Sequence, residues 1–127
     1  MNDRVILIVD DEKEVCQIVK EGLERLGAFQ IIVAHNGKDG FHMAQKAQPD
    51  LVLLDIDMPS IDGFKVLEQL KEDQKTYHIP VVMLTGQRDD SFKVAASRLY
   101  SEEYITKPIS MTALKDKIDP ILARFGK

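Results

Sequence analysis

Four strand-like segments in this chain each lead into a polar residue that can do chemistry. Asp10 and Asp11 close the first segment, Asp55 closes the second, Thr85 closes the third, and Lys107 follows the fourth. Continuous apolar runs of this length are typical of strands buried on both faces, as in a parallel sheet covered by helices. In such sheets, ligands bind beyond the carboxyl ends of the strands. The pattern therefore predicts one site that gathers these residues.

Helical segments alternate with these strands, because apolar residues recur there every three or four positions. The strands are predicted at residues 5–9, 29–34, 51–54, 81–84 and 104–106, and the helices at about 13–26, 36–49, 64–70, 90–100 and 110–125. Asn36 and Ser110 are predicted to cap two helices, Gly27 to end the first, and Pro120 to kink or split the last. This alternation predicts an α/β fold, a doubly wound five-stranded parallel sheet of flavodoxin-like order 2-1-3-4-5 with five helices.

In that strand order the first and third strands are neighbours, so the carboxylates of Asp10, Asp11 and Asp55 should converge. Carboxylates packed this closely repel one another and favour a bound cation, and an oxygen-rich site suits Mg²⁺. With the ion in place, one carboxylate can act as a nucleophile toward phosphorus. Asp55 is the best candidate because it ends the central strand, whereas Thr85 and Lys107 offer a hydroxyl and a positive charge for the phosphoryl oxygens.

Composition limits the class of protein. The chain has 127 residues, 44% of them hydrophobic, so we expect residues 1–127 to form a single domain. A net charge of -4 argues against nucleic-acid binding. The apolar run near the amino terminus is too short for a signal peptide or a membrane span, so a cytoplasmic protein is expected. Cys16 is the only cysteine and is interpreted as a buried or half-buried thiol on a helix.

At these residues the chain resembles the receiver domains of bacterial two-component response regulators, from about Arg4 to Phe125. The motifs are Val9-Asp10-Asp11-Glu12, Leu53-Leu54-Asp55-Ile56-Asp57-Met58-Pro59 followed by Asp62-Gly63, Met83-Leu84-Thr85-Gly86, and Tyr104-Ile105-Thr106-Lys107-Pro108. The resemblance implies a phosphorylation-dependent switch of a phosphorelay. Its phosphoryl donor would be a phosphohistidine on a sensor histidine kinase or on a histidine phosphotransfer protein.

The resemblance also assigns roles around a bound Mg²⁺. It implies that Asp55 accepts the phosphoryl group, and that Asp11 and Asp55 bind the ion together with the backbone carbonyl of Asp57. Asp10 would act through water. Thr85 and Lys107 would hold the phosphoryl oxygens.

The resemblance further implies how phosphorylation is read. Thr85 would move toward the phosphate and Tyr104 would turn inward, which changes the surface of the fourth helix, fifth strand and fifth helix. That surface would bind a downstream output protein or domain. The receiver itself would be a monomer or a phosphorylation-dependent dimer. No enzymatic activity is expected beyond self-phosphorylation and autodephosphorylation. The sequence leaves open whether the receiver stands alone, was cut from a longer regulator or belongs to a hybrid kinase.

Parts of the sequence are also compatible with two other functions. Asp55-Ile56-Asp57 also resembles the nucleophile motif of haloacid-dehalogenase-type phosphatases, but there the motif lies on the first strand and the further acidic pair follows the lysine. The second alternative is a receiver that binds partners without phosphate. Only the Tyr100-Ser101 pair supports it, because the family usually has Gly-Ala at that turn.

The three histidines, His35, His42 and His78, have no metal-ligand spacing to one another. Sequence reasoning therefore interprets them as surface residues. A tyrosine in strand 104–106 with its hydroxyl in solvent is the ordinary alternative to a switch role for Tyr104.

Overall fold

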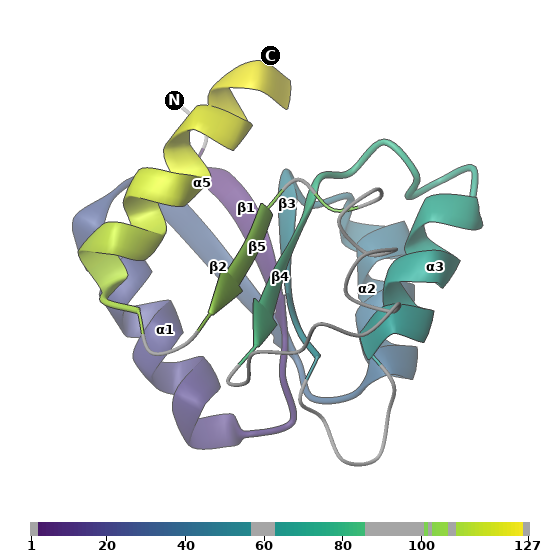
Figure 1. Cartoon of the computed structure of the whole chain (residues 1–127), viewed down its shortest axis with the longest axis horizontal. Helices are drawn as coiled ribbons and strands as arrows, with labels where there is room; N and C mark the ends of the chain where they lie inside the picture. The colour runs from purple at the N-terminus through teal and green to yellow at the C-terminus, as the bar shows by residue number, and fades with distance from the viewer. Residues whose placement is uncertain (1–2, 57–62, 86–100, 102, 107–108, 126–127) are drawn as a thin grey trace.

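The computed structural model of the chain describes residues 3–56, 63–85, 101, 103–106 and 109–125. Over these residues strands and helices alternate from residue 4 to residue 85, and one further strand and one further helix follow (Figure 1). The elements are β1 (Arg4–Val9), α1 (Lys13–Leu26), β2 (Phe29–Ala34), α2 (Gly37–Ala47), β3 (Leu51–Asp55), α3 (Gly63–Glu72), β4 (Val81–Thr85), β5 (Glu103–Thr106) and α5 (Met111–Phe125). Among the described helices, none is both long and apolar enough to cross a membrane.

All five strands form one parallel sheet in the order β2-β1-β3-β4-β5, which confirms the predicted fold class. The register aligns the carboxyl ends of the central strands. Val9 of β1 lies opposite Leu54 of β3, and Asp55 lies opposite Leu84 of β4. Residues that close neighbouring strands are therefore brought to one edge of the sheet.

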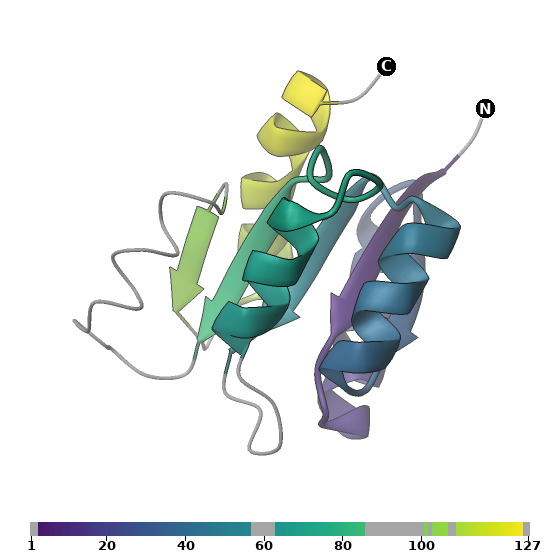
Figure 2. The same ribbon diagram turned by 90° about the vertical axis from the view of Figure 1, so that its right-hand side faces the viewer.

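Helices cover both faces of the sheet (Figures 1 and 2). Strand side chains alternate between the faces, so Ile6 and Ile8 pack with α1 and α5, whereas Leu7 and Val9 pack with α2 and α3. The four side chains are at most 2% exposed. This burial on both faces explains why the strands are continuous apolar runs in the sequence.

The predicted caps at Asn36 and Ser110 and the predicted end of the first helix at Gly27 are confirmed, the last with a difference in mechanism. The Asp39 N–H donates to Asn36 Oδ1 (2.8 Å), and the Ala113 N–H donates to Ser110 Oγ (3.1 Å). Gly27 ends α1 in an extended conformation with φ -165°, not in the left-handed one. A Cβ at Gly27 would lie 2.7 Å from the Phe29 ring, so a larger residue here would force that ring to shift.

The sequence predicts that Pro120 kinks or splits the last helix. The prediction of a split is wrong. Helix α5 runs without interruption from Met111 to Phe125. Pro120 and Asp116 are both exposed, so water can reach the Asp116 carbonyl that the ring leaves without its usual partner. Buried Ile118 and Ile121 on either side of the proline hold the helix on the sheet. The predicted helix at 90–100 and the Tyr100 turn lie outside the described residues.

Replacing Pro120 with alanine should stabilise the protein. Proline costs about 3 kcal/mol relative to alanine inside a helix, and about 1 kcal/mol of that is returned because proline restricts the unfolded chain. We expect Pro120→Ala to raise the free energy of unfolding, measured by urea denaturation, by about 2 kcal/mol. Lys117→Ala, an exposed change in the same helix, should alter it by less than about 0.5 kcal/mol. A destabilised Pro120→Ala variant would contradict this description of α5.

Candidate functional site

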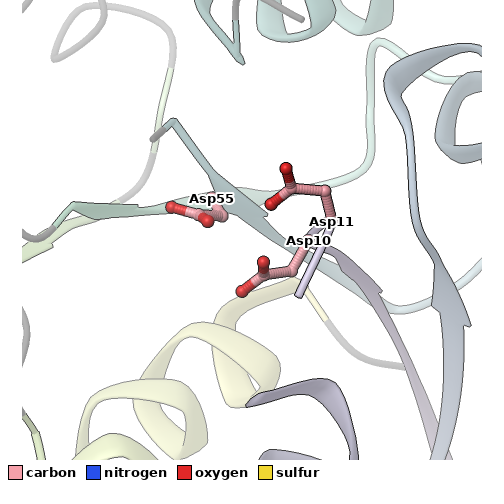
Figure 3. A group of neighbouring side chains, drawn as sticks. All are labelled: Asp10, Asp11 and Asp55. Atoms are coloured by element: carbon pink, nitrogen blue, oxygen red, sulfur yellow. The ribbon is translucent and has the colours of Figure 1, made fainter. Parts of the chain in front are cut away.

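Three carboxylates meet where β1 and β3 end. Asp10 follows β1 directly, and Asp55 is the last residue of β3. Because Val9 pairs with Leu54, the next residues along the two strands, Asp10 and Asp55, are neighbours. One oxygen each of Asp10, Asp11 and Asp55 lies within 4.8 Å of the others (Figure 3).

The cluster combines burial with high negative charge. Asp10 is 2% exposed and Asp55 is 1% exposed, whereas Asp11 is half-buried at the margin with solvent. Charges of the same sign at this separation repel strongly where water is excluded. Since the cluster offers carboxylate oxygens only, its chemistry suits a hard divalent cation such as Mg²⁺, which also retains several waters.

The backbone and side chain of Asp10 are held at several points. Its N–H donates to the Ala34 carbonyl of β2 (3.0 Å), and its Oδ1 accepts from the Glu12 N–H (3.0 Å). Its carbonyl oxygen accepts from the Cys16 thiol (3.4 Å) and lies 3.2 Å from His35 Nδ1. Contacts from β2 and α1 thus fix the residue that starts the acidic turn.

Cys16 is a buried thiol, as the sequence predicted. Burial raises its pKa to about 11, and the negative charges of Asp10, Asp55 and Asp11 add to that rise. The thiol is therefore protonated at neutral pH and acts as a hydrogen-bond donor, not as a nucleophile.

Gly63 allows α3 to begin directly against the end of β3. A Cβ at this position would lie 2.7 Å from the Ile56 Cα and 3.0 Å from the Asp55 carbonyl oxygen. Both contacts are with backbone atoms, which cannot rotate away. Glycine at position 63 therefore follows from the close approach of helix and strand behind Asp55.

Thr85 and Tyr104 lie on the neighbouring strands. Thr85 ends β4 and is 1% exposed, and Tyr104 of β5 lies opposite Met83. Met83 and Tyr104 both pack on the face of the sheet that α2 and α3 cover. Side chains two residues apart on a strand lie on the same face, so Thr85 shares the face of Met83 and therefore that of Tyr104. The Tyr104 hydroxyl is buried, so the alternative that placed it in solvent is wrong. Asp57, Gly86 and Lys107 lie outside the described residues.

The sequence did not predict the contact that His35 makes with Asp10. His42 and His78 are exposed, as predicted, but His35 is half-buried and contacts the Asp10 carbonyl. One feature of the sequence could have indicated this contact. His35 directly follows β2, and β2 pairs with β1, so the residues after the two strands are neighbours in a parallel sheet.

Comparison with known proteins identifies the family of this chain. The sequence profile of the family described as the response regulator receiver domain matches residues 6–119. Protein PilH of Pseudomonas aeruginosa is 38% identical, over 93% of this chain and 97% of PilH. The alkaline phosphatase synthesis transcriptional regulatory protein PhoP of Bacillus subtilis is 33% identical over 96% of this chain, which spans about half (50%) of that relative's length.

Solved structures show the same fold. The receiver domain protein (CheY-like) from Methanospirillum hungatei superposes with a TM-score of 0.87 at 26% identity, covering 98% of this chain and 97% of that one. The N-terminal domain of a response regulator receiver protein from Methanoculleus marisnigri gives a TM-score of 0.75 at 38% identity, covering 94% and 97%. The chain belongs to the response regulator receiver domain family, and receiver domains are signalling domains.

Removing one charge from the cluster should stabilise the metal-free protein. We expect Asp55→Asn, which keeps the shape of the side chain, to raise the free energy of unfolding in EDTA by about 1–2 kcal/mol because repulsion with Asp10 and Asp11 is relieved. Asp116→Asn, an exposed change on α5, should leave it within about 0.5 kcal/mol of wild type. Urea denaturation measures both, and a less stable Asp55→Asn protein would contradict the repulsion argument.

Proposed function

We propose that this chain is a phosphorylation-dependent switch of a two-component phosphorelay, in which Asp55 accepts the phosphoryl group. The observation that supports this proposal is the convergence of Asp10 and Asp11 on Asp55 at the carboxyl edge of a receiver-family sheet. Asp55 ends β3, which lies between β1 with its acidic turn and β4 with Thr85. The proposed metal ligands on β1 and the proposed phosphate ligand Thr85 on β4 would therefore lie on opposite sides of the Asp55 carboxylate.

Mg²⁺ is the proposed cofactor. Asp11 and Asp55 would bind it directly, together with the backbone carbonyl of Asp57, and Asp10 would bind through water. When bound, the ion would offset most of the negative charge of the three carboxylates and withdraw charge from the phosphoryl oxygens. The all-oxygen donor set within 4.8 Å supports this assignment.

The proposed reaction is a direct phosphoryl transfer. A carboxylate oxygen of Asp55 forms a bond to phosphorus while the bond from phosphorus to the donor's imidazole nitrogen breaks, and that nitrogen then takes up a proton. The product is an acyl phosphate on Asp55. Thr85 and Lys107 would hold the phosphoryl oxygens, since such transfer depends mainly on positioning and charge stabilisation.

Thr85 and Tyr104 are the proposed switch residues. Both lie on the same face of adjacent strands, so a shift of Thr85 toward a phosphate on Asp55 would alter the packing of Tyr104. The phosphate biases two arrangements only as far as its contacts differ between them. The surface of the fourth helix, β5 and α5 would then present the change to the output partner.

A phosphorylation-dependent switch needs a phosphoryl donor and an output partner. A histidine kinase or a histidine phosphotransfer protein would supply the phosphoryl group to a single receiver domain formed by residues 1–127. A downstream output protein or domain would read the altered surface, with the receiver a monomer or a phosphorylation-dependent dimer in the cytoplasm. The match covers 50% of PhoP, which is named as a transcriptional regulatory protein, and 97% of PilH.

Asp55→Asn should abolish phosphorylation, because the amide has no nucleophilic oxygen to form the acyl phosphate. Incubation with acetyl phosphate and Mg²⁺, followed by intact mass measurement, should show one phosphoryl adduct on wild type and none on Asp55→Asn. The control Asp116→Asn should be labelled like wild type. Labelling of Asp55→Asn at the wild-type rate would show that the nucleophile is wrongly assigned.

The same assay separates the other functions. If wild type forms no adduct and does not respond to beryllium fluoride, the chain is a phosphate-independent binding module and the proposal fails. Sustained turnover of a phosphomonoester would instead support the haloacid-dehalogenase-type reading.

Lys107→Ala should impair switching more than metal binding, because Lys107 is assigned to a phosphoryl oxygen and not to the ion. We expect the Mg²⁺ dissociation constant from calorimetric titration to stay within about threefold of wild type, while the NMR shift changes caused by beryllium fluoride at β5 are largely lost. Lys117→Ala serves as the control and should behave like wild type in both measurements. Loss of Mg²⁺ affinity with an intact switching response would reverse the assignment.

A further inference from the structure

The carbonyl oxygen of Asp10 receives two side chains from different parts of the fold. The Cys16 thiol donates to it from α1 (3.4 Å), and His35 Nδ1 approaches it from the junction of β2 and α2 (3.2 Å). The two side chains also approach each other, with Cys16 Sγ 3.8 Å from His35 Nδ1. Neither residue belongs to the machinery assigned above.

The chemistry of this contact fixes the form of the histidine. A carbonyl oxygen can only accept hydrogen bonds, so His35 Nδ1 must carry the hydrogen at a separation of 3.2 Å. In the neutral ring, Nε2 is then the nitrogen without hydrogen. A carbonyl oxygen has two lone pairs, so the imidazole and the thiol can donate to it together.

The orientation of the Asp10 carbonyl sets the orientation of the next residue. The carbonyl of Asp10 and the N–H of Asp11 belong to one planar peptide group, so fixing one direction fixes the other. The Glu12 N–H independently holds the Asp10 side chain through Oδ1. Together these contacts determine how the acidic turn faces Asp55.

We propose that His35 and Cys16 are positioning residues, which hold the Asp10 carbonyl and thereby aim the Asp10 and Asp11 carboxylates at the cation. This inference rests on the proposed function of the acidic cluster. His35 should contribute more than Cys16, because an imidazole N–H is a stronger donor than a thiol. Groups of this kind behind a metal ligand commonly change metal affinity by tenfold or more when removed.

The first experiment determines the tautomer of His35 in the wild-type protein. Long-range proton–nitrogen NMR correlation at about pH 8.5, where an ordinary histidine is neutral, distinguishes hydrogen on Nδ1 from hydrogen on Nε2. We expect His35 in the Nδ1–H form, with the exposed His42 and His78 serving as internal references in the Nε2–H form common in water. An Nε2–H form for His35 would overturn the proposal.

The second experiment measures Mg²⁺ dissociation constants by calorimetric titration. We expect His35→Ala to weaken binding about tenfold, and His35→Asn to stay within about threefold of wild type because its amide nitrogen takes the place of Nδ1. Cys16→Ala should show a smaller loss. His42→Ala is the matched control and should bind like wild type, while urea denaturation verifies that each variant is folded.

The outcomes separate this inference from the proposed function. If wild type binds no Mg²⁺, the cofactor assignment fails and the positioning role fails with it. If wild type binds and His35→Ala binds equally well, only the positioning role is overturned. An equal loss in His35→Ala and His35→Asn would also overturn it, because the hydrogen bond would not be the cause.

Discussion

Three buried or half-buried carboxylates repel one another at the carboxyl edge of the sheet. The register of β1 against β3 brings Asp10 beside Asp55, and the turn after β1 adds Asp11. Two unit charges about 4 Å apart repel by about 1 kcal/mol in bulk water and by about 4 kcal/mol at an effective dielectric constant of 20, so the energy depends on how much water reaches the pair. Other interactions in the fold must offset this repulsive energy. A bound cation would add an attraction between itself and each carboxylate.

The two-sided core supplies that offset. Complete burial of a leucine, isoleucine or valine side chain stabilises a protein by about 1.5–3 kcal/mol. Leu53 and Leu54 of β3 are both fully buried, on opposite faces, immediately before Asp55. The burial of these residues in β1 and β3 therefore opposes the repulsion among the acids at the ends of the same strands.

The sequence predicted the strand order and the convergence of the acids because both depend on patterns along the chain. Apolar runs mark buried strands, and parallel pairing places their ends together. The role of His35 could not be read in this way, because it depends on the β1–β2 register and on which ring nitrogen faces the Asp10 carbonyl. Helix α5 likewise continues through Pro120 because of packing that no local propensity describes. Gly63 was visible as a motif residue, but its reason, the approach of α3 to the backbone of Asp55, required coordinates.

We propose that the acids at the ends of β1 and β3 form one magnesium site around a phosphorus-accepting carboxylate. A crystal structure of the chain grown with Mg²⁺ and beryllium fluoride would show whether they do. We expect beryllium joined to the Asp55 carboxylate, with Mg²⁺ at about 2.1 Å from oxygens of Asp11 and Asp55. Beryllium fluoride on another side chain, or Mg²⁺ bound away from these two carboxylates, would contradict it.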